Sequence, residues 1–90
     1  MRYIKDPSAV LDYRVDWSQW LPANDRIVAS TFAVVDSDEL VIDDSSFDDT
    51  SATVWLSGGV AGERYVVTNH ITTEDGREDD RSLTITAKEL

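Results

Sequence analysis

Apolar and polar residues alternate along much of this chain, so that every second side chain belongs to the same class. Residues 11–17 read Leu-Asp-Tyr-Arg-Val-Asp-Trp, and residues 81–87 read Arg-Ser-Leu-Thr-Ile-Thr-Ala. A period of two is that of a β-strand with one buried and one exposed face. We therefore predict strands near both ends of the chain, with the apolar side chains of each strand facing a common core.

Four internal segments also predict strands, namely residues 26–35, 40–42, 52–57 and 65–73. Turn signals separate the segments at roughly 8–12 residues, a spacing typical of an antiparallel sandwich. The first of these segments changes phase, because Ile27 would lie on one face of a regular strand and Phe32 on the other. A β-bulge is expected to restore the register.

Together these strands predict an all-β fold, an Ig-like or fibronectin-like antiparallel β-sandwich of about six to seven short strands. Residues 11–90 are expected to form it as a single domain, because a chain of 90 residues supports one thin core. Residues 1–10, which include Pro7, do not fit a strand and predict a loose N-terminal arm.

The segment between the fourth and fifth predicted strands carries the most specific fold signal. Two turns, at Gly58-Gly59 and Ala61-Gly62, are followed by the pattern Gly-x-x-Tyr-x-Val that ends at Val67. In antiparallel sandwiches a tyrosine at this point folds back and hydrogen-bonds the upstream backbone, which makes a tyrosine corner. We assign that structural role to Tyr65, which carries no catalytic chemistry.

The amino-acid composition argues against several kinds of site and partner. The chain has no cysteine, so it has no disulfide, no thiolate metal site and no cysteine nucleophile. Eight basic residues stand against eighteen acidic ones, a net charge of −10, and the basic residues do not cluster. Neither nucleic acid nor an anionic membrane is therefore an expected partner. No apolar run approaches a membrane span and the start does not resemble a signal peptide, so we expect a soluble chain that is made in a cytoplasm.

The acidic residues concentrate in two windows, residues 36–49 and residues 74–80. The second window predicts a charged hairpin loop around Asp75-Gly76, a favoured turn pair. The first supplies enough carboxylates for calcium, which takes about six to eight oxygen ligands, yet it lacks the spacing and the glycine of an EF-hand. The alternative is a solvated, self-repelling loop that protects a sheet edge. We expect no bound metal and no cofactor.

Catalytic residues are not evident. His70 is the single histidine, and it has neither a serine nor a cysteine nucleophile at a recognisable spacing, nor a second histidine with which to share a metal. We interpret it as an outward-facing or hydrogen-bonded strand residue. A paired-carboxylate glycosidase needs a cleft for which a single small sandwich has little room. The chain is therefore predicted not to be an enzyme.

Aromatic residues supply the candidate contact sites. If Val54 and Leu56 face the core, Trp55 points outward, and an exposed tryptophan is typical of a protein interface. Trp20 is either a lid over one end of the sandwich or part of a contact surface. Tyr3 and Ile4 would gain burial by docking on a neighbouring subunit, although a frayed terminus accounts for them equally well.

Three groups of residues also occur together in one family. They are Asp12-Tyr13, Asp16-Trp17 and Trp20-Leu21 near the start, residues 54–59 and 61–62 in the middle, and residues 68–69, 71–73, 76–77 and 80–82 near the end. With them the chain resembles very small tailed-bacteriophage proteins, the fiber–tail adaptors or head–tail connector-type virion proteins. The segment 33–51 has no counterpart in that resemblance.

The resemblance implies a structural virion protein that joins tail fibers, or connector layers, to the tail through protein–protein interfaces. Its partners would be other tail, connector and fiber proteins, its arrangement a ring of several copies, and its location the tail or head–tail junction of the virion. The alternative is a calcium- or carbohydrate-binding Ig-like module of a bacterial surface protein. Linkers at either end would favour the module, and the sequence shows none.

Overall fold

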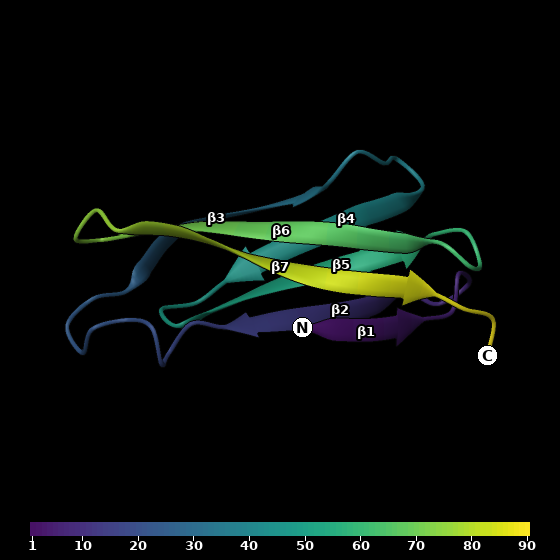
Figure 1. Ribbon diagram of the computed structural model, residues 1–90. Coiled ribbons are helices and arrows are strands. Elements are labelled where there is room, and N and C mark those ends of the chain that lie inside the picture. Colours follow the sequence, from purple (N-terminus) through teal and green to yellow (C-terminus); the bar gives the residue numbers. More distant parts are fainter.

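Two β-sheets pack face to face in the computed structural model, which describes residues 1–90 (Figure 1). One sheet has the strand order β1-β7-β6-β3 and the other the order β2-β5-β4. The strands are β1 (Arg2–Lys5), β2 (Leu11–Asp16), β3 (Ile27–Val34), β4 (Leu40–Phe47), β5 (Ser51–Gly58), β6 (Arg64–Thr73) and β7 (Glu78–Ala87). The predicted all-β sandwich is therefore confirmed.

The chain crosses between the sheets at most of its connections. Only β4–β5 and β6–β7 are hairpins within one sheet, and all strand pairs are antiparallel except β1 with β7. From the second strand onward, the orders β2-β5-β4 and β7-β6-β3 are those of the two sheets of an immunoglobulin fold. The molecule is elongated, with principal extents of 43 × 22 × 19 Å.

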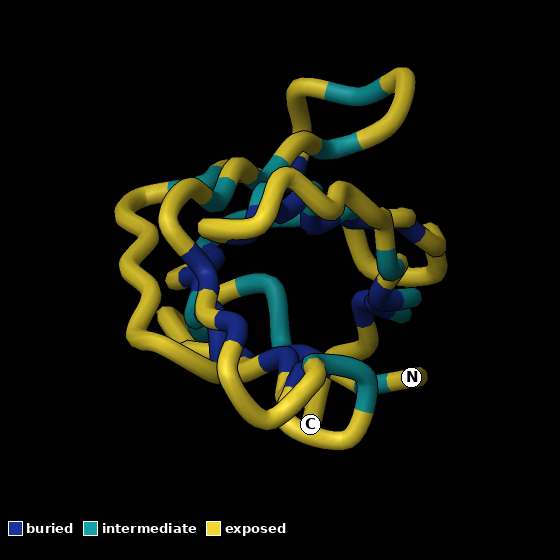
Figure 2. Tube along the Cα trace, turned by 90° about the vertical axis from the view of Figure 1, so that its left-hand side faces the viewer, coloured by how far each residue is buried: buried dark blue, intermediate teal, exposed yellow.

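The core lies between the sheets and is built by the alternation seen in the sequence. Seen along the strands, the buried residues line the inside of the trace while the exposed ones cover its outside (Figure 2). Val15, Val54 and Leu56 from one sheet are fully buried, as are Val67 and Ile85 from the other. Since thirteen side chains make up the whole cluster, the core is thin and each member contributes appreciably.

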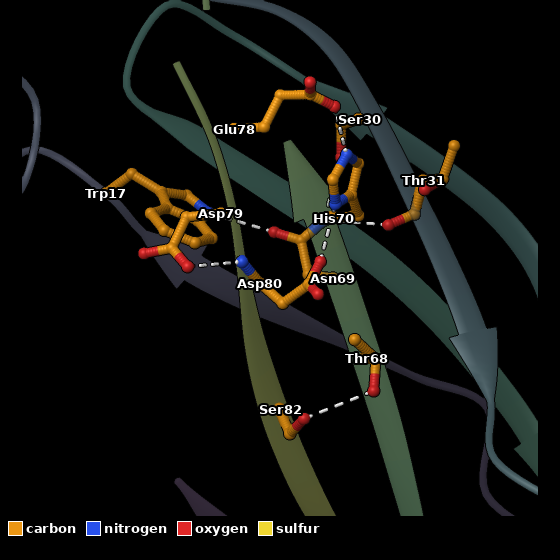
Figure 3. A network of polar contacts seen from close by, with 10 residues as sticks. All are labelled: Trp17, Ser30, Thr31, Thr68, Asn69, His70, Glu78, Asp79, Asp80 and Ser82. Carbon is orange, nitrogen blue, oxygen red and sulfur yellow. Dashed lines mark hydrogen bonds and ion pairs between the residues drawn. The ribbon is translucent and has the colours of Figure 1, made fainter. Parts of the chain in front are cut away.

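A buried hydrogen-bond network crosses the core and joins the two sheets (Figure 3). The indole Nε1–H of Trp17, just beyond β2, donates to Asn69 Oδ1 on β6 at 2.9 Å. The amide Nδ2 of Asn69 in turn donates to Ser30 Oγ at 2.9 Å and to the carbonyl of Thr31 at 3.0 Å, both on β3. Both Trp17 and Asn69 are completely buried, so a polar group of this network that lost its partner could not bond to water instead.

The tyrosine next to the Gly58-Gly59 turn closes one end of the sandwich. Tyr65 Oη accepts a hydrogen bond from the backbone N–H of Val60, five residues upstream, at 2.8 Å, and donates one to Glu39 at 2.9 Å. This is the geometry of a tyrosine corner. Gly58 has φ +77°, and a Cβ there would lie 2.8 Å from the carbonyl oxygen of Glu39, so the turn requires glycine at this position.

The expected loose arm is instead an edge strand. Residues 2–5 pair in parallel with the end of β7, with Arg2 opposite Thr84 and Lys5 opposite Ala87. Lys5 is only 1% exposed, and its ammonium donates hydrogen bonds to the carbonyl oxygens of Asp6 and Gly58, both at 2.9 Å. Burial lowers the pKa of Lys5. Because Gly58 ends β5, this lysine fastens β1 to the opposite sheet, which explains why the segment is ordered.

The acidic windows are also more regular than expected. The third predicted strand continues through the acidic run to Phe47, with an irregularity between Ile42 and Asp44, and pairs with β5 throughout. The last strand begins at Glu78 rather than after the acidic window. Outward-pointing carboxylates leave the backbone ladder intact, so the expectation of loops, which rested on the charge of these residues, is wrong for residues 43–47 and 78–80. The predicted bulge in β3 is confirmed between Ile27 and Ala29.

A buried carboxylate fixes the far end of the β6–β7 hairpin. Asp25, whose side chain is inaccessible, pairs with Arg77 Nη1 at 2.9 Å and accepts hydrogen bonds from the backbone N–H groups of Arg26 and Asp75. Burial raises the pKa of Asp25, but these bonds and one from Thr73 outweigh it and lower that pKa to about 2. The hairpin turn is thereby held against the loop that precedes β3.

Replacing Asn69 with alanine should destabilise the protein strongly, because the Trp17 indole N–H is left buried without an acceptor. We expect a loss of about 2–3 kcal/mol in the free energy of unfolding measured by urea denaturation. Ser30→Ala, which removes a single bond of the same network, should cost about 1 kcal/mol or less. Equal losses in the two variants would contradict the central role given to Asn69.

Asp25→Asn should remove a pH dependence of stability. Because the folded-state pKa of Asp25 is about 2, below the unfolded value of about 3.9, its contribution is present above pH ~4 and is lost as the pH falls toward 2. We expect the variant to melt lower than the wild type at pH 7, with a smaller difference near pH 2. The control is Asp79→Asn, which alters an exposed carboxylate that forms no ion pair. In this variant the melting temperature should change between pH 7 and pH 2 as much as it does in the wild type.

Candidate protein-binding surfaces

Trp55 lies in the middle of β5 on the outer face of the three-stranded sheet. Its neighbours Val54 and Leu56 are fully buried in the core, while the tryptophan is 41% exposed. The strand parity predicted from the alternation is therefore correct. An indole of this size on an open sheet face leaves apolar area in water unless another molecule covers it.

Acidic residues surround this tryptophan on both neighbouring strands. In the sheet register Trp55 lies opposite Asp12 on β2 and opposite Asp44 on β4. A shallow depression of about 390 Å³ opens beside the indole, and its lining consists of Val10, Asp43, Asp44, Trp55 and Ser57. We call these residues together with Asp12 the Trp55 surface.

The carboxylates of the Trp55 surface have no basic partner. None of Asp12, Asp43 and Asp44 takes part in an ion pair of the molecule, although Asp44 Oδ1 accepts a hydrogen bond from the backbone N–H of Ser45. Arg14, which follows on the outer face of β2 opposite Thr53, forms no ion pair either. The indole is thus exposed in a negatively charged environment.

Trp20 covers one end of the core. It is half-buried, packs against the core cluster, and meets Trp17 edge-on with 5.3 Å between ring centroids and an interplanar angle of 71°. The guanidinium of Arg81 lies 4.2 Å from the centroid of the Trp17 ring, and its Nη1 donates to the carbonyl of Asp16. Of the two roles open for Trp20, this position matches the lid.

Tyr3 and Ile4 point to opposite sides of β1. Tyr3 is half-buried and packs on Tyr13, with 4.8 Å between the ring centroids. Ile4 is 58% exposed, opposite Thr86 and on the same outer sheet face as Val66, which is also exposed. The structure therefore does not bring the four candidate contact residues together, and Trp55 and Ile4 lie on the outer faces of different sheets.

His70 sits on the outer face of the four-stranded sheet between two carboxylates (Figure 3). Its Nδ1 is 2.6 Å from Asp80 Oδ1 and its Nε2 is 2.9 Å from Glu78 Oε1, both on β7. Hydrogen bonds to Asp80 and Glu78 raise the pKa of His70. The histidine is therefore an outward-facing residue whose two ring nitrogens both contact carboxylates, in agreement with the interpretation from the sequence.

The two acidic windows approach each other at Arg26, whose guanidinium pairs with Glu74 at 2.8 Å and with Asp49 at 3.8 Å. No group of three or more histidine or acidic side chains is placed so that it could hold a metal ion, so the calcium alternative gains no support from the geometry. The structure also contains no helix that is long and apolar enough to cross a membrane.

Comparison with protein families decides the broad class. Residues 5–86 match the family model described as podophage GP4 fiber-tail adaptor protein gp77. The chain belongs to this fiber-tail adaptor family. The match confirms the resemblance seen in the sequence and supports a structural role in the phage tail, with other tail or fiber proteins as partners. A structural adaptor family also suggests a protein without enzymatic activity. No curated protein matches the chain.

Sequence reasoning found the exposed tryptophan but missed the residues around it. The alternation ends the third predicted strand at Ile42 and leaves Asp43 and Asp44 in a predicted loop, with nothing to place them beside Trp55. It identifies Asp12 only as a polar position of a strand. The missing information was the pairing of β5 with β2 and β4, which the alternation of a single strand does not contain.

Replacing Trp55 and Trp17 with alanine, one at a time, should show which of the two side chains belongs to the surface and which to the core. Trp55→Ala is expected to change the free energy of unfolding by about 1 kcal/mol or less, since the side chain is 41% exposed. Trp17→Ala should cost about 3–5 kcal/mol, because that side chain is fully buried. Urea denaturation followed by far-UV circular dichroism measures both, and a Trp55→Ala loss as large as that of Trp17→Ala would show that the outer face is not open.

Proposed function

We propose that this chain joins tail fibers to the tail of a podophage virion purely through protein–protein interfaces, in several copies around the tail axis. The match to the fiber-tail adaptor family over residues 5–86 carries this proposal. The Trp55 surface supports it, since an exposed indole on an open sheet face suits a contact with another protein.

The arrangement of exposed residues also suits assembly into a ring. Ile4 and Val66 are exposed on the outer face of the four-stranded sheet, on the opposite side from Trp55, so a contact between copies through them leaves the Trp55 surface free for another protein. Contacts between two different patches of a subunit close into a ring when the rotation between neighbours allows it. A thin core gains stability from the same assembly, because a partner that binds only the folded state stabilises it.

Purified virions of the phage that encodes this chain provide the direct test. Quantitative mass spectrometry should find the chain in a fixed stoichiometry to the other tail proteins, and cryo-electron microscopy should show its sandwich between tail and fibers. Complementation with Trp55→Ala should lower incorporation about tenfold while leaving the free protein folded. Thr53→Ala, an outward residue of the same strand, is the matched control. Absence of the wild-type chain from purified particles would refute the proposal.

A further inference from the structure

The Trp55 surface has a chemical character that narrows the kind of partner it fits. Its centre is apolar, with the exposed indole and the exposed side chain of Val10, and its border carries Asp12, Asp43 and Asp44. Interfaces of proteins are commonly built with such an apolar centre and a charged rim. The sign of the rim determines which partner residues are favoured there.

From this pattern we infer that the Trp55 surface binds a basic segment of a partner protein, with an arginine or lysine side chain over the indole and the carboxylates around it. Cations are attracted to the face of tryptophan more than to other aromatic rings. The three carboxylates are free of ion pairs within the chain, so they are available to an incoming cation. This inference rests on the proposed adaptor function and specifies its partner.

The same chemistry already occurs once inside the molecule. Arg81 places its guanidinium 4.2 Å from the centroid of the Trp17 ring while donating a hydrogen bond to the carbonyl of Asp16. In that site an arginine lies over an indole and is fixed by an oxygen of the neighbouring residue on β2. Trp55 offers a second indole, more exposed and with carboxylate oxygens on both adjacent strands, and no arginine of the chain lies over its ring.

A second copy of this chain fits the surface less well. The chain carries a net charge of −10, and two Trp55 surfaces facing one another would bring their carboxylates together. Juxtaposed like charges across an interface oppose binding. A basic segment of another protein brings the complementary charge and covers the indole at the same time.

The test uses the full-length protein labelled with ¹⁵N and a hexa-arginine peptide as the basic probe. Each of the three tryptophans gives an indole Nε1–H signal that NMR can follow, and Trp17, which is buried and bonded to Asn69, serves as an internal reference. We expect a saturable shift of the Trp55 indole signal and of the amide signals of Asp12, Asp43 and Asp44. Trp55→Ala should weaken binding of the peptide about threefold to tenfold.

Variants that remove equal charge distinguish binding at the Trp55 surface from non-specific electrostatic attraction of the peptide to an acidic protein. Asp43→Asn/Asp44→Asn should weaken binding about tenfold at low salt. The control Asp38→Asn/Asp79→Asn removes the same charge from two exposed positions that form no ion pair and lie away from the surface. Equal weakening in both double variants, or peptide-induced shifts centred on residues 74–80, would overturn the inference.

Two further outcomes have defined meanings. A shift of the Trp55 signal with protein concentration in the absence of peptide would identify a second copy as the occupant and overturn the inference. If the chain is present in virions but the Trp55 signal does not shift when the peptide is added, the inference of a basic partner is wrong and the adaptor function stands. If the chain is absent from virions, the adaptor function fails whatever the peptide does.

Discussion

The hydrogen bond between the Trp17 indole and the Asn69 carboxamide joins the two sheets across a thin core. A sandwich with thirteen core side chains has little apolar area to hold its layers in register, so a directional bond between them matters more than it would in a larger domain. Asn69 also reaches β3 through Ser30 and Thr31. One buried amide thereby positions elements from both layers, while Asp25 and Lys5 fasten the periphery.

The division between core and surface could be read from the sequence because it depends on local alternation. The outward direction of Trp55, the burial of Val54 and Leu56, and the bulge in β3 all follow from side-chain period along one strand. The edge strand β1 and the ordered acidic strands could not be read in this way. Their order comes from pairing with segments far along the chain, and from the buried ammonium of Lys5, a residue type that is rarely expected inside a protein.

The Trp55 surface, too, could be predicted only in part from the sequence. One strand's pattern revealed the exposed indole, whereas the carboxylates around it are brought together only by the register of three strands. Acidic residues that look alike in the sequence have different tasks in the structure. Glu78 and Asp80 hold His70, Asp25 fixes a hairpin, and those beside Trp55 form no ion pair within the chain. Total charge therefore says little about the surface until its distribution over the sheets is known.

The parallel pairing of β1 with β7 has a practical consequence for anyone who fuses another protein to this one. Pairing covers only the last part of β7, since Arg2 lies opposite Thr84, and the stretch from Glu78 to Leu83 is paired on its β6 side alone. Residues added before Met1 would run alongside that open stretch of backbone, where they can continue the sheet. A fusion placed after Leu90 leaves from beyond the end of β7 and avoids this edge, so the C-terminus is the better attachment point for a label.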